Sequence, residues 1–348
     1  MWRFPHPAPK GKAMRLVPFF LPGMGCPGKC VFCDQRAQTG VTYGGLERAL
    51  ISLTELLTTM DGSFALGFFG GTFTGLPPEW QKRFLEQAAQ FRKNGALTHL
   101  RVSTRPDRID RAALSLLQTG GVDMVELGVQ SFSTPVLTAS GRGYDGARAI
   151  RACEDVRDGG FELGIQLLPG LPGHDAGLWR KDAARVVALR PEVVRVYPCV
   201  VIGGTPLADM HARGEYTPWS LPLAVEETAR AVLGFWRAGI RIIRLGLAAQ
   251  PDMLARLKAG PWHPAFGNMV RSAALRLFLE ERLAGLTGRI RAVWMPCALS
   301  GDLWGHGRAN VPALARIGVT RERVKFWSET DIGVELSGPD PVPGEEHA

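Results

Sequence analysis

Short apolar runs that end in glycine or proline alternate along the chain with longer stretches in which apolar residues recur at helical spacing. The short runs predict strands at residues 16–21, 65–70, 100–103, 124–128, 163–168 and 193–199. The amphipathic stretches between them predict helices at residues 44–60, 78–94, 110–119, 144–157 and 175–188. Repeated strand–helix units form a parallel sheet, either a barrel or an open sheet, whose ligand site lies at the carboxyl ends of the strands.

The remainder of the chain predicts smaller elements. An apolar run at 240–247 indicates one more strand, and helical patterns follow at 251–258 and 264–284. Beyond a glycine-rich linker we predict three strands and one helix, at residues 289–296, 323–327, 332–336 and 310–317. The whole is an α/β protein whose predicted parts are an N-terminal extension (1–14), a barrel (15–250), a helical extension with its linker (251–288), a small α/β appendix (289–337) and a disordered tail (338–348).

Composition narrows the class of protein. Hydrophobic residues make up 45% of the chain and charged residues 21%, which provides for a large core and excludes wholesale disorder. No uncharged apolar run approaches the roughly 18 residues of a bilayer span, and the N-terminus has no apolar signal region. We therefore expect a cytoplasmic protein with no membrane partner. The net charge of +8 permits nucleic-acid binding without requiring it.

Three of the six cysteines fall within eight residues, as Cys26, Cys30 and Cys33 in the spacing Cys-x3-Cys-x2-Cys. In a reducing compartment such clustering indicates metal rather than disulfides. Thiolates hold iron–sulfur clusters, and three of them leave one iron of a four-iron cube free to bind a substrate or cofactor. The alternatives are a zinc site, which lacks a fourth ligand nearby, and structural thiols.

Three cysteines in this order after a first strand resemble those of the radical S-adenosylmethionine (SAM) enzymes. The resemblance implies a [4Fe–4S] cluster whose open iron is chelated by the amino and carboxylate groups of SAM. An electron from the cluster then cleaves SAM to methionine and a 5′-deoxyadenosyl radical, which abstracts a substrate hydrogen. The resemblance also implies a partial (β/α)6 radical-SAM barrel, in agreement with the strand–helix units above. An electron donor such as flavodoxin or ferredoxin is implied as a partner.

Under this resemblance, residues that follow the predicted strands hold SAM. The family binds the methionine amino group with residues that correspond here to Gly70, Gly71 and Thr72. Thr72 replaces a glutamate that is common at its position in the family. Arg142 pairs with the SAM carboxylate through its planar guanidinium. The other predicted SAM contacts, to the ribose hydroxyls and the adenine, are Ser103, Arg105, Gln130, Gly170 and Leu171. The structural alternatives are ordinary turns, turn caps and a surface arginine.

Longer sequence motifs narrow the resemblance to one group of radical-SAM enzymes. FGGTFTGLP at 69–77, ELGVQS at 126–131 and QLLPGLPG at 166–173 resemble the radical-SAM domain of the Elongator catalytic subunit and its short bacterial relatives, over residues 15–270. ELGVQS is also similar, more distantly, to oxygen-independent coproporphyrinogen III oxidase. The Elongator resemblance implies modification of wobble uridine in tRNA. The appendix is too short for that family's acetyltransferase domain, which we therefore do not expect.

Three functions stay open on the sequence. The first is radical chemistry on tRNA or another RNA, and the second is the same chemistry on a small molecule such as a tetrapyrrole. The third is a non-catalytic protein that binds SAM and the cluster. The oligomeric state stays open as well.

The appendix carries candidate residues of its own. The glycine-rich basic loop at 303–310 predicts either a KH-like clamp on RNA or a stabilising cap on the barrel. Among the cysteines outside the triplet, we expect Cys153 in the core and Cys199 at the cavity. We interpret the last four tryptophans as core residues rather than base-stacking platforms: Trp262, Trp294, Trp304 and Trp327.

Overall fold

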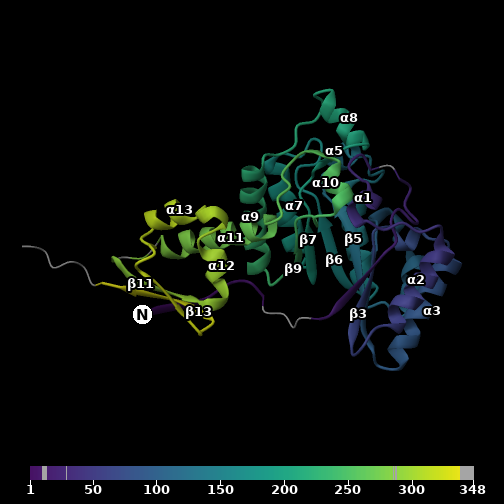
Figure 1. Cartoon of the computed structure of the whole chain (residues 1–348), viewed down its shortest axis with the longest axis horizontal. Helices are drawn as coiled ribbons and strands as arrows, with labels where there is room; N and C mark the ends of the chain where they lie inside the picture. Colours follow the sequence, from purple (N-terminus) through teal and green to yellow (C-terminus); the bar gives the residue numbers. More distant parts are fainter. Residues whose placement is uncertain (10–13, 29, 285, 287, 338–348) are drawn as a thin grey trace, which may run out of the picture.

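The computed structural model describes residues 1–9, 14–28, 30–284, 286 and 288–337. Its main feature is a seven-stranded parallel sheet that curls into a partial barrel in chain order (Figure 1). The strands are β2 (Leu16–Phe20), β3 (Phe64–Phe69), β4 (Leu97–Thr104), β5 (Met124–Gln130), β6 (Glu162–Leu167), β7 (Val193–Val196) and β9 (Arg241–Leu245). The predicted partial barrel is thus confirmed, and the apolar run at 240–247 supplies its seventh strand. The predicted tail, 338–348, lies outside the described residues, as do residues 10–13 of the extension and 285 and 287 of the linker.

Helices follow the strands and cover the outside of the sheet. They are α2 (Leu46–Thr58), α3 (Pro78–Lys93), α4 (Arg111–Thr119), α6 (Gly146–Asp158) and α7 (Ala176–Leu189). Three of them begin where an aspartate side chain accepts a hydrogen bond from the first turn of the helix, at Asp110, Asp145 and Asp175. Such N-caps satisfy backbone N–H groups that have no partner within the helix. Because aspartate is a preferred N-cap residue, these helix starts could be predicted from the sequence.

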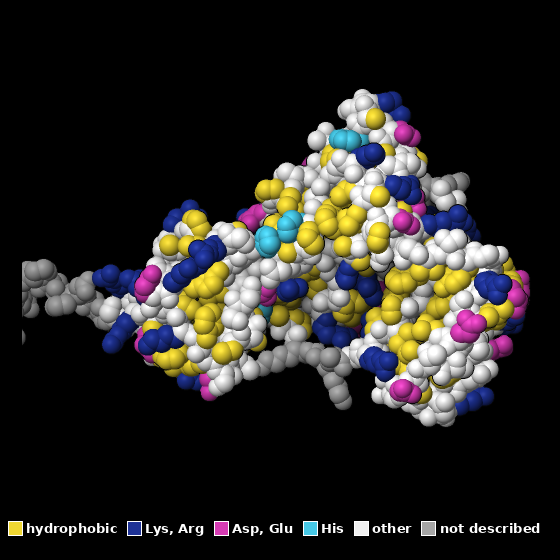
Figure 2. All heavy atoms as spheres, in the orientation of Figure 1, with side chains coloured by type: hydrophobic (Ala, Val, Ile, Leu, Met, Phe, Trp, Pro, Cys, Tyr) yellow, Lys and Arg dark blue, Asp and Glu magenta, His cyan; other side chains and the backbone are white. Residues whose placement is uncertain are grey.

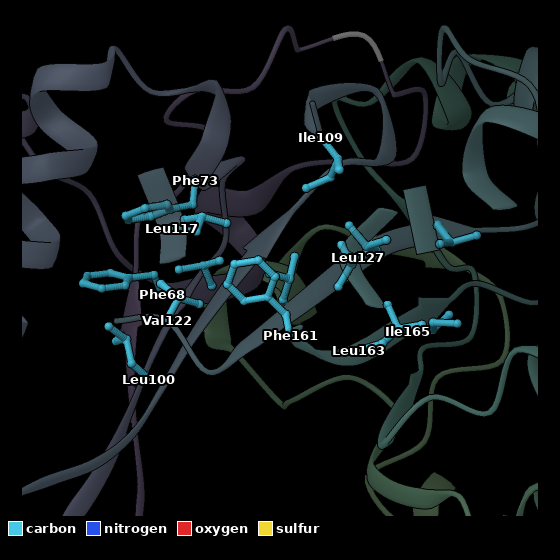
Figure 3. Packing of buried hydrophobic residues seen from close by; sticks show 14 of the residues in the cluster. Phe68, Phe73, Leu100, Ile109, Leu117, Val122, Leu127, Phe161, Leu163 and Ile165 are labelled. Carbon is cyan, nitrogen blue, oxygen red and sulfur yellow. The ribbon is translucent and has the colours of Figure 1, made fainter. Parts of the chain in front are cut away.

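The main core fills the space between the sheet and these helices. Figure 3 shows Phe68 and Leu100 of the strands packed with Phe161 and with Leu117 of α4. All residues of β3 and β5 are buried, as expected for strands of a parallel sheet covered on its outer face. The sheet is therefore a rigid base for the loops that follow its strands.

A second lobe contains the C-terminal elements and the N-terminus. Its sheet has the order β1-β13-β11-β12, formed by β1 (Trp2–Pro5), β11 (Ile290–Pro296), β12 (Val324–Trp327) and β13 (Asp331–Leu336). One face of this sheet shares a hydrophobic core with α9 (Leu221–Arg237) and α11 (Phe266–Leu283). In Figure 1 these two helices lie between the small sheet and the barrel strands.

Two elements of this lobe were not predicted. The strand β1 is short and ends in a proline, and its partner β13 lies at the other end of the chain. The helix α9 packs against both α7 and α11, and its apolar pattern is as one-sided as that of the predicted helix α2, so a helical signal was present in the sequence and was missed. The segment 1–5 therefore belongs to the same sheet as the appendix.

The short elements complete the chain. They are α1 (Gln35–Thr39), α5 (Thr134–Ala139), β8 (Val201–Ile202), α8 (Pro206–Ala212), α10 (Pro251–Ala255), β10 (Leu257–Ala259), α12 (Ser300–Leu303) and α13 (Val311–Arg316). The helix predicted at 251–258 is wrong in its last residues, because Leu257–Ala259 pairs with β8 as a strand. The strand predicted at 193–199 ends at Val196. No helix in the described part of the chain is long and apolar enough to cross a membrane.

The glycine-rich loop before α13 is held against α11. The buried side chain of Asn310 donates hydrogen bonds to the Ser272 carbonyl at 2.9 Å and the Leu303 carbonyl at 3.0 Å. The sheet beside it is completed by β1 and shares its core with α9 and α11. This arrangement favours a stabilising cap as the interpretation of the appendix. It does not favour an independent KH-like module.

Candidate functional site

A cavity of about 480 Å³ opens at the carboxyl ends of the barrel strands. Residues that follow β2, β3, β4 and β5 line it, together with side chains of β6, β7 and β9. Most residues predicted from sequence as a site lie in its wall: Cys26, Cys30, Cys33, Gly70, Gly71, Thr72, Ser103, Arg105, Gln130 and Arg142. A second cavity of about 620 Å³ borders the same three cysteines from the side of residues 41–45.

The cysteine loop is fixed against the turn that follows β3. The Thr72 amide donates a hydrogen bond to the Met24 carbonyl at 2.9 Å. A Cβ atom on Gly71 would lie 2.6 Å from the Leu21 carbonyl oxygen and closer still to that of Met24. A Cβ on Gly25 would likewise meet the backbone of this turn. Glycine is therefore required at these positions, because only bare backbone fits between the two loops.

The three thiols lie around one end of the cavity. Cys30 is buried, and Cys26 and Cys33 are half-buried. Burial, together with the neighbouring charges of Cys30 and Cys26, raises the pKa of the Cys33 thiol to about 12, while the charge of Arg142 acts in the opposite direction. A metal bound beside Cys33 would supply the positive charge that stabilises its thiolate.

The number of thiols matches the ligand set of an iron–sulfur cube with one open iron. Within the part of the chain that the structure describes, no three His, Cys, Asp or Glu side chains converge on a single ion. The ligands of one cube each hold a different iron, so they surround a volume rather than a point. The cavity supplies that volume beside the thiols.

Two buried guanidinium groups flank the Cys30 sulfur. Arg142 Nη1 donates to Cys30 Sγ at 3.0 Å, and Arg105 Nη1 donates to the same sulfur at 3.4 Å. Arg142 also donates to the Gly128 carbonyl and to the Tyr144 hydroxyl, while Arg105 is held by Asp107 at 2.8 Å. Arg142 is only 4% exposed, which rules out the alternative of a surface arginine.

Polar atoms without partners point to a ligand in the cavity. Thr72 Oγ1 and Gln130 Oε1 are buried and have no hydrogen-bond partner among the described residues. Buried polar atoms are normally paired, so these two indicate groups supplied by a bound molecule or by water. Gln130 also has a φ of 69°, a left-handed conformation that is rare outside glycine and often found at functional sites. Ser103 Oγ accepts a hydrogen bond from Gln166 Nε2 at 3.1 Å in the same wall.

Two predicted contacts do not reach this cavity. Gly170 and Leu171 are absent from its lining. The side chain of Leu171 is buried in a cluster with Cys30 and Phe32, and the Gly170 carbonyl accepts a hydrogen bond from the Tyr216 hydroxyl at 2.6 Å. Leu171 therefore packs beside the cysteine loop, whereas Gly170 is held by Tyr216.

The isolated cysteines lie away from the cavity. Cys153 is buried in α6, which confirms the expectation of a core residue. Cys199 does not line the cavity, although Pro198 and Val200 on either side of it do. Burial raises the pKa of the Cys199 thiol to about 12. The prediction that Cys199 faces the cavity is therefore wrong, because its side chain packs on the opposite side of the segment.

Sequence reasoning missed a charged pair in the cavity wall. Arg195 Nε donates to Glu126 Oε2 at 2.6 Å, and the guanidinium lies 4.7 Å from the centre of the Phe69 ring. Glu126 is buried, and Arg195 lines the cavity. The available signal was a charged residue inside an otherwise apolar strand, since such a residue is buried only when it is paired. Tyr144, Gln166 and Arg244 were missed as well.

Comparison with known proteins adds information on the family. Sequence profiles match two consecutive parts of the chain, the Radical SAM superfamily over residues 20–183 and the Radical_SAM C-terminal domain over residues 191–276. A tRNA uridine(34) acetyltransferase of Methanocaldococcus jannaschii is 28% identical over 264 residues, which are 63% of this chain and 49% of that protein. Elongator complex protein 3 of Homo sapiens is 28% identical over 200 residues, 50% of this chain and 36% of that protein.

A solved structure is similar over a larger part of the chain. It is the archaeal Methanocaldococcus infernus Elp3 with an N-terminal deletion, at a TM-score of 0.58 and 25% sequence identity. The similarity covers 77% of this chain and 63% of that chain. The chain thus spans about half the length of the first curated relatives that it matches.

Proposed function

Because this chain belongs to the radical SAM superfamily, enzymes whose cofactors are a [4Fe–4S] cluster and SAM, we propose that Cys26, Cys30 and Cys33 hold the cluster and that SAM lies beside it in the cavity. The observation that carries this proposal is that the cavity brings the three thiols together with polar atoms that have no partner in the described chain. When bound, the cluster supplies the electron for reductive cleavage of SAM to methionine and a 5′-deoxyadenosyl radical that abstracts a hydrogen atom from the substrate. An electron donor such as flavodoxin or ferredoxin reduces the enzyme.

The chain's own residues then bind and orient SAM. Arg142 is fixed by Gly128 and Tyr144, so its guanidinium is preorganised as a donor to the SAM carboxylate. Thr72 Oγ1 and Gln130 Oε1 accept hydrogen bonds from the amino group and a ribose hydroxyl of the ligand. Apolar side chains of the cavity wall exclude water from the reacting groups: Phe20, Phe69 and Leu168.

We propose further that the substrate is RNA, and tRNA in particular. The relative from M. jannaschii is named as a tRNA uridine(34) acetyltransferase, and it aligns with this chain over 264 residues. The cavity wall adds Arg244, whose positive charge suits a nucleotide with its phosphates. The alternative of a small molecule such as a tetrapyrrole has no specific observation in its favour.

Turnover with and without RNA tests this function. The anaerobically reconstituted enzyme is given SAM, reduced flavodoxin and either unmodified tRNA transcripts, a tetrapyrrole or no substrate. We expect tRNA to increase the formation of 5′-deoxyadenosine and to yield a nucleoside of altered mass after digestion. An increase with the small molecule and not with tRNA would overturn the RNA substrate. If reduced, cluster-loaded enzyme forms no 5′-deoxyadenosine with any addition, the SAM site itself is wrong.

Arg142→Ala is expected to weaken SAM binding ten- to hundredfold while the cluster is retained. Loss of a hydrogen bond to a charged group costs about 1.5–3 kcal/mol, and each 1.4 kcal/mol is about tenfold in affinity. Cluster retention is expected because Arg105 still donates to Cys30 Sγ. Equilibrium binding of SAM to the variant, at matched iron content, measures the effect.

The matched control is Arg151→Ala, which removes an exposed arginine from α6 outside the cavity. This control should bind SAM as the unaltered protein does. Unchanged affinity in a fully loaded Arg142→Ala enzyme would remove Arg142 from the SAM site.

A further inference from the structure

One face of the small sheet carries a row of basic and aromatic side chains. The strand pairings align Arg3, Gly333, Trp294 and Lys325 across β1, β13, β11 and β12. The neighbouring residues of β1, β13 and β11 point to the opposite face, which is buried against α9 and α11, whereas Phe326 on the edge strand β12 is exposed. Since side chains alternate along a strand, the row lies on the outward face of the sheet.

Two tryptophans form a platform on this outward face. Trp327 lies two residues after Lys325 on β12, and its ring reaches across the sheet to Gly333. A Cβ atom on Gly333 would lie 2.9 Å from Trp327 Cη2, so the absence of a side chain makes room for the ring. The rings of Trp294 and Trp327 have their centres 5.5 Å apart and their planes tilted by 33°. We name this pair the tryptophan platform. Both residues are half-buried on the sheet surface, so their interpretation as core residues is wrong.

The platform is held in place through its indole N–H groups. Trp294 Nε1 donates to Glu335 Oε1 at 2.8 Å, and Trp327 Nε1 donates to the Asp331 carbonyl at 2.9 Å. These bonds satisfy the polar edge of each ring within the protein. What each ring offers to a partner is therefore its aromatic face.

Two exposed cations lie over those faces. The Arg3 guanidinium carbon is 4.8 Å from the centre of the Trp327 ring, and Lys325 Nζ is 4.8 Å from that of Trp294. Neither cation forms an ion pair with an acidic group among residues 1–9, 14–28, 30–284, 286 and 288–337. Their charge is therefore available to an anionic partner that also presents flat rings.

We propose that the tryptophan platform stacks unpaired nucleobases of RNA and that Arg3 and Lys325 bind the flanking phosphates. Aromatic faces combined with cationic side chains are the means by which proteins hold single-stranded nucleic acid. An acidic peptide would draw the two cations off the rings and put nothing in their place, whereas RNA supplies phosphates for the cations and bases for the uncovered rings. This proposal rests on the proposed RNA substrate. It gives the protein a second surface, besides the cavity, that binds this RNA.

The platform lies apart from the cavity. In Figure 1, α9 and α11 separate the small sheet from the barrel. Figure 2 shows Lys and Arg side chains beside hydrophobic ones on this C-terminal lobe. The platform therefore binds a different segment of the RNA from the nucleotide that enters the cavity, and it contributes affinity rather than chemistry.

Binding of RNA to platform variants tests the proposal in the full chain. The probes are a single-stranded oligouridine and a tRNA transcript, and the readouts are the dissociation constant and the quenching of tryptophan fluorescence. Stacking contributes about 1–3 kcal/mol per base, so the double substitution Trp294→Ala, Trp327→Ala should weaken oligouridine binding about tenfold or more. The double phenylalanine variant should retain most of the affinity, because it keeps aromatic faces. Binding to unaltered protein should fall as salt rises.

The matched control is Trp80→Ala. Trp80 is a barrel tryptophan whose ring is also covered by an arginine, Arg83 at 4.2 Å, and it lies far from the small sheet on α3. This variant should bind RNA normally. Formation of 5′-deoxyadenosine without RNA should be equal in all variants, which shows that the barrel is intact.

The outcomes separate the platform from the proposed function. If the alanine double variant keeps full affinity for both RNAs, the platform is wrong, whether or not tRNA stimulates turnover. If this variant fails to fold, Arg3→Glu with Lys325→Glu decides in its place, and unchanged binding in that variant overturns the proposal. Loss of RNA affinity with normal turnover on a small substrate would support the platform and overturn tRNA as the reacting substrate.

Discussion

Replacing Cys30 with alanine is expected to abolish both the iron–sulfur cluster and all cleavage of SAM. Three thiols already leave one iron of a cube without a protein ligand, so the loss of another leaves two irons unheld. Cys30 is the buried member of the triplet, and both Arg142 and Arg105 donate hydrogen bonds to its sulfur. No side chain positioned by the same contacts can replace it. Iron and sulfide content, visible absorbance and 5′-deoxyadenosine formation measure the result.

The control for this prediction is Cys297→Ala, which removes an exposed cysteine of the second lobe. That variant should load a complete cluster and cleave SAM normally. The converse test replaces Cys26, Cys30 and Cys33 together. A triple variant that still holds a full cube would show that the cluster assignment is mistaken.

Gly71→Ala is expected to displace the cysteine loop and to prevent most cluster loading. The added Cβ would meet the carbonyl oxygens of Leu21 and Met24, and both are backbone atoms with no rotamer to change. The Met24 carbonyl also accepts the hydrogen bond from the Thr72 amide that holds the loop to the turn. Overpacking of this kind costs about 1–3 kcal/mol of folding stability. We expect a lower melting temperature and SAM affinity reduced by at least about tenfold.

The matched control is Gly234→Ala in the helix α9. A Cβ there meets no atom within 4 Å, and alanine favours helix over glycine. The control should therefore be stabilised by about 0.5–1 kcal/mol, with unchanged SAM affinity. Full loading and normal SAM binding in Gly71→Ala would mean that the two loops are not held together by this backbone contact.

Much of the barrel was predictable because its signals are local. The strand β3 is an unbroken apolar run that stops at Gly70, and helices such as α4 begin at an aspartate cap. Such signals depend on a few neighbouring residues, so they survive without knowledge of the fold. The helix α9 carries the same kind of local signal, a serine cap at Ser220 and an apolar pattern as one-sided as that of α2, and it was overlooked rather than hidden. The strand β1 was missed because it acquires strand structure from β13, near the far end of the chain.

The residues of the candidate site likewise divide into those that local sequence predicted and those that depend on packing. The cysteine triplet and the Gly70–Thr72 station were legible as motifs, since each is a run of adjacent residues at a strand end. Gly170 and Leu171 form an equally clear motif, yet neither lines the cavity, and Leu171 packs in a cluster with Cys30 and Phe32. A sequence motif therefore predicted that its residues lie at the carboxyl end of a strand. It did not predict whether their side chains face the cavity, because that direction depends on the elements packed around them.

The sequence by itself determined that this protein is a parallel strand–helix barrel with three clustered thiols at the carboxyl ends of its strands. Hydrophobic periodicity, helix caps and clustered cysteines each depend only on residues that are close together in the chain. Only the tertiary structure decided which side chains meet those thiols and which surfaces stay open. Arg142 reaches Cys30 from 112 residues away, and Trp327 lies over Gly333 on a sheet that joins both ends of the chain. Contacts of this kind depend on how distant elements pack against one another, and the spacing of residues along the chain carries no record of that packing.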